Sequence, residues 1–368
     1  MRILLVLEYY HPNIGGLEKL FKSLVDELDA QGHEITILTN KIRAGQNKVQ
    51  RAGNVTIYRY NFFNRYLFTI LAFFPALRLA RQADLIQTTS YNAGVPAFFA
   101  ARLTGKKVCI TFHEVWLSLW HQLPFFGRIS KWLHYGFEWS LLRLPFDKFI
   151  AVSGSTKEAL VEAGVHREKV SLIYNGIDYQ QLKQVLADPI PSSQRDTYTF
   201  LYFGRLGISK GLDVLIKALH FLKQRQTQFR LMLIIPPKPA SLSRRIHAMV
   251  DEWQVGVHIQ FLSELTEEHL FQQVLHSDAV VIPSYNEGFC FTAVETVALD
   301  KPIISSGRGA LKEVVGGKFL TFADQDPKAL ANSMEMAMQG KWQWKEKKTF
   351  HLSETVAAYI ACYEDLLG

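Results

Sequence analysis

The amino-acid sequence predicts an α/β protein of two doubly wound, Rossmann-like domains that face each other across a cleft. Three observations predict this fold: apolar strand-like runs alternate with helical patterns, the alternation stops once and restarts, and 368 residues exceed one ordinary core. The predicted domains are residues 1–187 and 198–350. A last helical segment, 351–368, could pack on either domain, and we assign it to the first.

The first 40 residues predict a strand, a helix and a second strand. Residues 2–7 (RILLVL) are apolar, and residues 33–40 (HEITILTN) are the second strand. Between them, residues 17–32 carry apolar side chains at helical spacing and end at Gly32. Such a unit implies parallel strands joined by a right-handed crossover.

The same alternation continues along both predicted domains, with a break at residues 186–197 (LADPIPSSQRDT). Two prolines, two serines and mixed charges in that stretch predict a linker. The remaining predicted strands of the first domain are residues 55–60, 83–90, 107–114, 148–155 and 170–178, and those of the second are 199–205, 229–236, 258–263, 278–284, 301–306 and 318–322.

Composition excludes several classes of protein. A hydrophobic fraction of 48% and a charged fraction of 20% exclude a disordered chain. Cys109, Cys290 and Cys362 include no CxxC pair, which excludes a disulfide framework and favours a reducing, cytoplasmic compartment. The run at residues 2–7 is too short for a secretory signal, and residues 66–77 are shorter than the roughly 20 that span a bilayer.

The net charge of +7 is unevenly distributed. Residues 1–190 contain 22 Lys or Arg and 15 Asp or Glu, whereas residues 191–368 contain 19 of each. This asymmetry suggests an anionic partner for the first half, such as a membrane surface, a nucleic acid or an acidic substrate. The alternative is an ordinary scatter of surface lysines.

Three loops at predicted strand ends carry candidate site residues, because ligands of doubly wound sheets bind at the carboxyl ends of the strands. Gly15 and Gly16 precede a helix and could cradle a phosphate, or could simply form a tight turn. In GRLGISKG, Arg205 and Lys210 suit a diphosphate, although two solvated cations would look the same.

The third loop lies within PSYNEGFCFTAVE, residues 283–295. Glu287 and, eight residues later, Glu295 could accept hydrogen bonds from the hydroxyls of a sugar or ribose. The alternative is one capping acid and one solvated acid. The backbone N–H groups of Gly288, Phe289 and Cys290 could meet a phosphate at a helix start.

One histidine also stands at a predicted strand end. His113 closes the strand KVCITFHE, where it could donate to or accept from a substrate hydroxyl. A histidine considered alone is more often structural.

Together these features resemble the retaining GT-B glycosyltransferases, in particular family 4 (glycosyl transferases group 1). The order and spacing of the motifs carry the resemblance over nearly the whole chain. The motifs are PNIGGLEKL, FHE, AVSGSTKEAL, IYNGID, GRLGISKGLDVLIKA and the two glutamates of residues 287–295.

The resemblance implies roles for the candidate residues. Arg205 and Lys210 would neutralise the leaving diphosphate of a nucleotide-sugar, and Glu287 would hold hydroxyls of the donor sugar. Glu295 would bind the ribose, and His113 would contact the donor sugar near the reacting centre.

The remaining donor-binding roles fall on the glycine loop and on the backbone after Glu287. Gly15 and Gly16 would meet the diphosphate or the acceptor, and the N–H groups of Phe289 and Cys290 would bind phosphate or sugar. The resemblance also implies retention of the anomeric configuration without a bound metal. The sequence has no His/Cys ligand cluster, in agreement with that.

The sequence departs from the family pattern at positions near the donor. It has IIPPKP (234–239) and Ser263 where glycines are common. The base of the donor is therefore left open between the uracil of a UDP-sugar and the guanine of a GDP-sugar. Cys290 replaces a frequent glycine and Phe291 a frequent leucine, which leaves the sugar open.

Two segments of the first domain are rich in aromatic residues and cations. Residues 58–81 and 115–148 interleave Phe, Tyr and Trp with Arg and Lys, a pattern typical of contact with a membrane surface. The alternative is helices that pack the core of the domain. Nucleic acid fits less well, because the cations are scattered among apolar residues and no recognition motif occurs.

The sequence therefore predicts a retaining glycosyltransferase that moves a sugar from a UDP- or GDP-sugar to a lipid-linked or glycan acceptor. We expect it to act at the cytoplasmic face of a membrane, in the synthesis of a surface polysaccharide or glycolipid. The alternatives are a nucleotide-sugar epimerase of the same fold and a non-catalytic scaffold that binds sugar or lipid.

Overall fold

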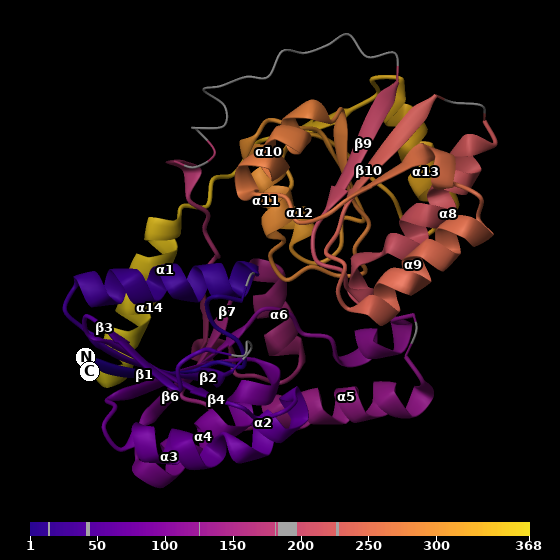
Figure 1. The fold of residues 1–368 in the computed structure, drawn as a ribbon. Helices are drawn as coiled ribbons and strands as arrows, with labels where there is room; N and C mark the ends of the chain where they lie inside the picture. Colours follow the sequence, from indigo (N-terminus) through magenta and orange to yellow (C-terminus); the bar gives the residue numbers. More distant parts are fainter. Residues whose placement is uncertain (14, 42–44, 125, 181, 183–196, 226–227) are drawn as a thin grey trace. The chain divides into compact units, whose positions relative to one another are not determined.

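The computed structural model describes residues 1–368 except for 14, 42–44, 125, 181, 183–196 and 226–227. The described chain forms two compact α/β units (Figure 1). The first contains residues 1–122, 126–176 and 350–368, and the second contains residues 123–125 and 177–349. The predicted linker lies outside the described residues, apart from Thr197.

The first unit is built on an eight-stranded sheet with the order β3-β4-β2-β1-β5-β6-β7-β8. Its pairings are parallel except for β3 with β4, which is antiparallel. The strands are β1 (Arg2–Val6), β2 (Glu34–Asn40), β3 (Val49–Ala52), β4 (Val55–Tyr60), β5 (Leu85–Thr89), β6 (Lys107–Phe112), β7 (Lys148–Ala151) and β8 (Val170–Leu172). The helices are α1 (Gly16–Ala30), α2 (Arg65–Leu71), α3 (Phe73–Ala80), α4 (Gly94–Thr104), α5 (Arg128–Leu142), α6 (Gly154–Glu162) and α14 (Leu352–Leu367).

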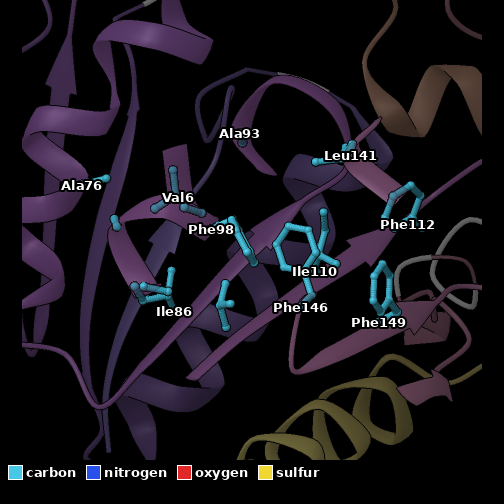
Figure 2. Packing of buried hydrophobic residues seen from close by; sticks show 14 of the residues in the cluster. Val6, Ala76, Ile86, Ala93, Phe98, Ile110, Phe112, Leu141, Phe146 and Phe149 are labelled. Atoms are coloured by element: carbon cyan, nitrogen blue, oxygen red, sulfur yellow. The ribbon is translucent and has the colours of Figure 1, made fainter. Parts of the chain in front are cut away.

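Helices cover both faces of this sheet, as the apolar runs require. Successive side chains of a strand point to opposite faces, so β1 contributes to two separate cores. Ile3 and Leu5 pack with α1 and α14. Leu4 and Val6 pack with α2 to α5, where Phe98, Ile110 and Phe146 lie close together (Figure 2).

The second unit has a seven-stranded sheet with the order β11-β10-β9-β12-β13-β14-β15, parallel except for β14 with β15. Helices α8, α9 and α13 cover one face, and α10, α11 and α12 lie on the other (Figure 1). The strands are β9 (Tyr198–Phe203), β10 (Phe229–Ile234), β11 (Ile259–Leu262), β12 (Ala279–Ile282), β13 (Ile303–Ser305), β14 (Gly317–Thr321) and β15 (Gln343–Lys345). The helices are α8 (Leu212–Lys223), α9 (Ala240–Glu252), α10 (Glu267–His276), α11 (Phe291–Ala298), α12 (Leu311–Val314) and α13 (Pro327–Met338).

The predicted α/β fold of two doubly wound domains is confirmed. Two strands that the sequence does not predict, β3 and β15, are short antiparallel strands at the sheet edges. Every residue of β3 is exposed, and β15 reads QWK, so neither carries the apolar pattern by which a buried strand is recognised.

Candidate active site

The candidate site of the second unit lies where the order of its strands reverses. From β9 the chain proceeds outward to β10 and β11, and then returns to place β12 on the other side of β9. The loops that follow β9 and β12 therefore leave neighbouring strands at the same sheet edge. In doubly wound sheets this is the position at which ligands bind.

Lys210 and Glu287 meet between these two loops. Lys210 Nζ donates to Glu287 Oε1 over 2.8 Å, and the two side chains are only 16% and 6% exposed. Ser284 Oγ donates to the same carboxylate oxygen over 2.6 Å. Removing an ion pair from water carries a desolvation cost, and the hydroxyl offsets part of it by supplying a further hydrogen bond to the carboxylate.

The backbone of the two loops is also joined directly. Tyr285 N donates to Ser209 O over 2.8 Å. Gly211 has a φ of +68°, and a Cβ there would overlap the carbonyl oxygen of Pro283. Only glycine combines this conformation with such a close approach, so GRLGISKG can bring Lys210 to Glu287 because Gly211 ends the motif.

Ser284 is held from the opposite side by two further donors. Ser306 Oγ and Gln325 Nε2 donate to its carbonyl oxygen over 2.7 and 2.9 Å. The carbonyl of Glu287 accepts from Ala310 N over 2.8 Å. Both groups of the ion pair are thus fixed by strand ends and turns. Ser284 is not among the residues that the sequence motifs indicate, although its place directly after a strand and three residues before Glu287 is a usable signal.

Arg205 is the exposed cation of the same site. Its backbone carbonyl accepts a hydrogen bond from the Tyr202 hydroxyl over 3.4 Å. Within the described part of the chain, its guanidinium makes no hydrogen bond or ion pair. Burial raises the pKa of Tyr202, so that this phenol stays neutral near pH 7. The guanidinium of Arg205 is therefore available to bind an anion beside the buried pair of Lys210 and Glu287.

The residues that follow Glu287 form the start of α11. Cys290 lies directly before the helix with a φ of +70°, a backbone conformation in which glycine is the unstrained residue. Its side chain is buried, and burial raises the pKa of the thiol well above its ordinary value, which leaves it protonated. Phe289 is buried with it, Gly288 precedes them, and Glu295 lies half-buried one helical turn further on.

A second buried polar contact lies beside the loop and was not predicted. Tyr285 OH donates to Asp213 Oδ2 over 2.8 Å at the start of α8. Burial raises the pKa of the Asp213 carboxyl, while the hydrogen bond from Tyr285 opposes that shift. The contact ties the β12 loop to α8, the helix that begins directly after Lys210 and Gly211.

Three predicted site residues belong to the first unit. His113 directly follows β6 and is half-buried. Gly15 caps α1 in an extended conformation, and Gly16 is the first residue of that helix. The carboxylate of Glu18 packs over Gly15 and accepts from Asn13 Nδ2 over 2.7 Å. A phosphate at the same place would require the Glu18 side chain to turn away.

In the residues that the structure describes, no group of three or more His, Cys, Asp or Glu side chains is arranged to hold a metal ion. The expectation of a reaction without a metal stays a prediction.

Comparison with known proteins identifies the class of enzyme. Residues 14–181 match the model of Glycosyltransferase Family 4, and residues 187–351 match that of Glycosyl transferases group 1. The chain is a glycosyltransferase of the GT-B type. This GT-B glycosyltransferase is 26% identical to an uncharacterized glycosyltransferase of Methanocaldococcus jannaschii over 86% of its own length and 83% of that protein. It is 23% identical to the gpi3 subunit of the Schizosaccharomyces pombe phosphatidylinositol N-acetylglucosaminyltransferase, over 94% and 75% of the two chains.

Solved structures share the fold of this GT-B glycosyltransferase at low identity. Sucrose-phosphate synthase from Thermosynechococcus elongatus superposes with a TM-score of 0.79 at 21% identity, covering 100% of this chain and 99% of that one. The Anabaena protein HepE, in complex with UDP and glucose, superposes with a TM-score of 0.70 at 17% identity, covering 99% of each chain.

Proposed function

We propose that this glycosyltransferase moves a sugar from a UDP- or GDP-linked donor, with retention of the anomeric configuration, to a lipid-linked or glycan acceptor at the cytoplasmic face of a membrane. The observation that carries the proposal is the buried pair of Lys210 and Glu287 at the strand-order reversal, with Arg205 exposed on the same loop. Support for the donor comes from structural neighbours that were solved with UDP or UDP-glucose.

The chemistry needs cations that are already in place. As the bond between the anomeric carbon and the diphosphate oxygen breaks, negative charge grows on that oxygen. Lys210 and Arg205 would neutralise this charge without reorganisation, because Glu287 already holds the Lys210 ammonium. The acceptor hydroxyl forms the new bond to the anomeric carbon and passes its proton to the departing phosphate.

Glu287 would have two tasks in this reaction. One carboxylate oxygen holds Lys210 and accepts from Ser284. A carboxylate offers several acceptor positions, so Glu287 could also accept from hydroxyls of the donor sugar. Glu295 would serve the ribose, His113 the sugar, and the backbone of Gly288, Phe289 and Cys290 the phosphate or sugar. Gly15 and Gly16 would serve the diphosphate or the acceptor.

Donor turnover tests this site. The Lys210→Met and Glu287→Gln variants should release nucleoside diphosphate from UDP- or GDP-sugars at least about 100-fold more slowly than the natural protein, the scale of losing one charge-stabilising group. Lys318→Met and Glu268→Gln make the same changes at exposed positions of the second unit and should keep natural turnover. Natural turnover in both site variants would overturn the assignment.

The same assay separates the alternatives. An epimerase would change the configuration of the donor sugar. It would neither release nucleoside diphosphate nor form a product that depends on the acceptor. A scaffold would bind the donor, which a rise in melting temperature would show, but it would not turn the donor over. Either result would contradict transfer.

The proposed membrane contact rests on exposed apolar side chains of the first unit. Phe63, before α2, is 78% exposed, and Ile70 in α2 is 65% exposed. Trp132, in α5, is 63% exposed. These side chains are therefore not buried in the core on this side of the sheet, whereas Phe62 and Phe68 are. The α2–α3 surface consists of Phe63, Tyr66, Leu67, Ile70, Leu71 and Phe74.

The segment that carries the α2–α3 surface is basic, although Arg65 at the start of α2 pairs with Glu8 over 3.4 Å. Residues 35–83 contain eight Lys or Arg and no Asp or Glu. Directly after α5, the Arg143 guanidinium lies 3.6 Å from the centroid of the Trp139 ring. Apolar side chains bordered by cations suit the interface of an anionic bilayer. No helix in the described part of the chain has the length and apolar character needed to cross a membrane.

Vesicle sedimentation tests this contact. The natural protein should sediment with vesicles that contain phosphatidylglycerol at low salt, and Ile70→Glu should reduce the bound fraction several-fold. Val257→Glu changes a residue of the second unit that is 88% exposed, and should bind as the natural protein does. If the natural protein stays in the supernatant, the membrane proposal is wrong.

A further inference from the structure

A cavity of about 450 Å³ lies in the second unit beneath α12. The sheet register places Ser305 of β13 beside Thr321 of β14, and Ile303 beside Phe319. These pairs share one face of the sheet, because side chains two apart on a strand point the same way. Helix α12 forms the opposite wall. The residues that line the cavity include Ser305, Ser306, Lys312, Phe319, Thr321 and Lys345.

The inner end of the cavity is polar and incompletely bonded. Ser305 is fully buried, and its Oγ has no hydrogen-bond partner among the described residues. A buried hydroxyl without a partner costs free energy, which a bound ligand with its own hydrogen-bonding group would recover. Ser306 also lines the cavity, and Thr321 supplies a third hydroxyl at its exposed side.

The charge of the lining is positive. Lys312 is exposed on α12, and Lys345 Nζ donates to its carbonyl oxygen, which brings the Lys345 ammonium from the edge strand β15 to the helix. The lining residues include no Asp or Glu. Two ammonium groups without a neighbouring carboxylate in the wall favour an anionic group such as phosphate.

We propose that this cavity is a second binding site, for a sugar monophosphate. The lysines would hold the phosphate, the hydroxyls of Ser305 and Ser306 would meet sugar hydroxyls, and Phe319 would contact the apolar face of the ring. The volume lies within the range of small-molecule sites. The site lies along β13, β14 and β15. Its residue Ser306 touches the β12 loop through the carbonyl of Ser284, but neither Lys210 nor Glu287 lines the cavity.

The test is thermal unfolding of the full chain with glucose 6-phosphate. At ten times its dissociation constant, the ligand should raise the melting temperature by about 2–4 °C. Inorganic phosphate alone should give a smaller shift, and glucose alone a smaller one still. No shift with glucose 6-phosphate, or an equal shift with phosphate alone, would overturn the assignment.

Variants place the binding within the molecule. Lys345→Met and Ser305→Ala should each lose most of the shift, and neither removes a partner on which the core depends. Lys318→Met is the matched control. Lys318 is exposed and does not line the cavity, because it lies next to Phe319 on β14 and successive side chains of a strand point to opposite faces.

The donor site is distinguished by one more variant. Lys210→Met should keep the glucose 6-phosphate shift even if it abolishes donor turnover. If the shift disappears in Lys210→Met but persists in Lys345→Met and Ser305→Ala, the ligand binds at the donor loops and the second site does not exist.

Discussion

The ammonium of Lys210 lies 2.8 Å from Glu287 Oε1, although 77 positions separate the two residues in the chain. Lys210→Met should lower the free energy of unfolding by about 3 kcal/mol, because it leaves a buried carboxylate without its cation. The double variant Lys210→Met/Glu287→Gln should lose clearly less, since no charge is then left unpaired. Urea unfolding measures both. A double variant that loses the sum of the single losses would contradict this coupling.

Gly211 is predicted to be irreplaceable by alanine. Gly211→Ala adds a Cβ that overlaps the Pro283 carbonyl, so the loop after β9 must move and Lys210 with it. We expect a loss of about 3 kcal/mol and reduced donor turnover. Gly105 has a similar φ of +65° but no atom within 4 Å of a Cβ, so Gly105→Ala should cost only about 1 kcal/mol. Equal melting temperatures of the two variants would refute the steric argument.

Two buried tyrosines of α14 differ in the hydrogen bonding of their hydroxyl groups, and removing each hydroxyl tests this difference. Tyr359 OH lies 3.0 Å from Thr111 Oγ1, whereas Tyr363 OH is buried with no partner among the described residues. Tyr359→Phe should destabilise the protein by about 1 kcal/mol through the lost hydrogen bond. Tyr363→Phe should be neutral or stabilising, because it removes an unsatisfied hydroxyl. Urea denaturation of the pair decides, and the reverse order of stabilities would be inconsistent with these contacts.

The buried carboxyl of Glu138 should make stability depend on pH. It accepts from Trp116 N, Leu117 N and Trp120 Nε1 over 2.7–2.8 Å, and from Tyr91 OH over 3.3 Å. Burial nevertheless raises its pKa above the ordinary value of 4.5. The folded state therefore binds the proton more tightly than the unfolded state, and this contribution to stability is lost as pH rises through the raised pKa.

The Glu138→Gln variant isolates that contribution. It cannot titrate, so the stability of the natural protein minus that of the variant should decrease as the pH rises from about 4 to about 7. The variant itself should be about 2 kcal/mol less stable at low pH, because an amide N–H₂ faces donors that the carboxyl accepted. Urea unfolding across this range measures the difference, and a difference that grows with pH would refute the shift.

The parallel strands can be predicted because burial on both faces gives near-continuous apolar runs. The pattern at residues 55–60 has the bounds of β4, whereas the pattern at 107–114 overruns β6 by two residues, His113 and Glu114. The apolar pattern alone does not mark where the ladder of hydrogen bonds stops. The exposed edge strands β3 and β15 carry no such pattern and cannot be recognised by it.

The candidate site can be predicted only as far as local motifs reach. Spacing and strand ends indicate Lys210 and Glu287 separately, but their contact depends on the adjacency of β9 and β12, which the sequence does not state. Ser306 and Gln325 hold Ser284 through hydrogen bonds across 22 and 41 positions of chain, which no local pattern can indicate.

The return of the chain to the first unit has a consequence for how the protein is made. Helix α14 supplies Tyr359 and Tyr363 to the core that contains Ile3 and Leu5, yet residues 177–349 leave the ribosome before it does. The second unit is therefore the first to have its whole chain available, while the first still lacks α14 on the side of its sheet where only α1 packs against Ile3 and Leu5. Chaperone contact during synthesis should concentrate on the apolar side of α1 until the last helix emerges.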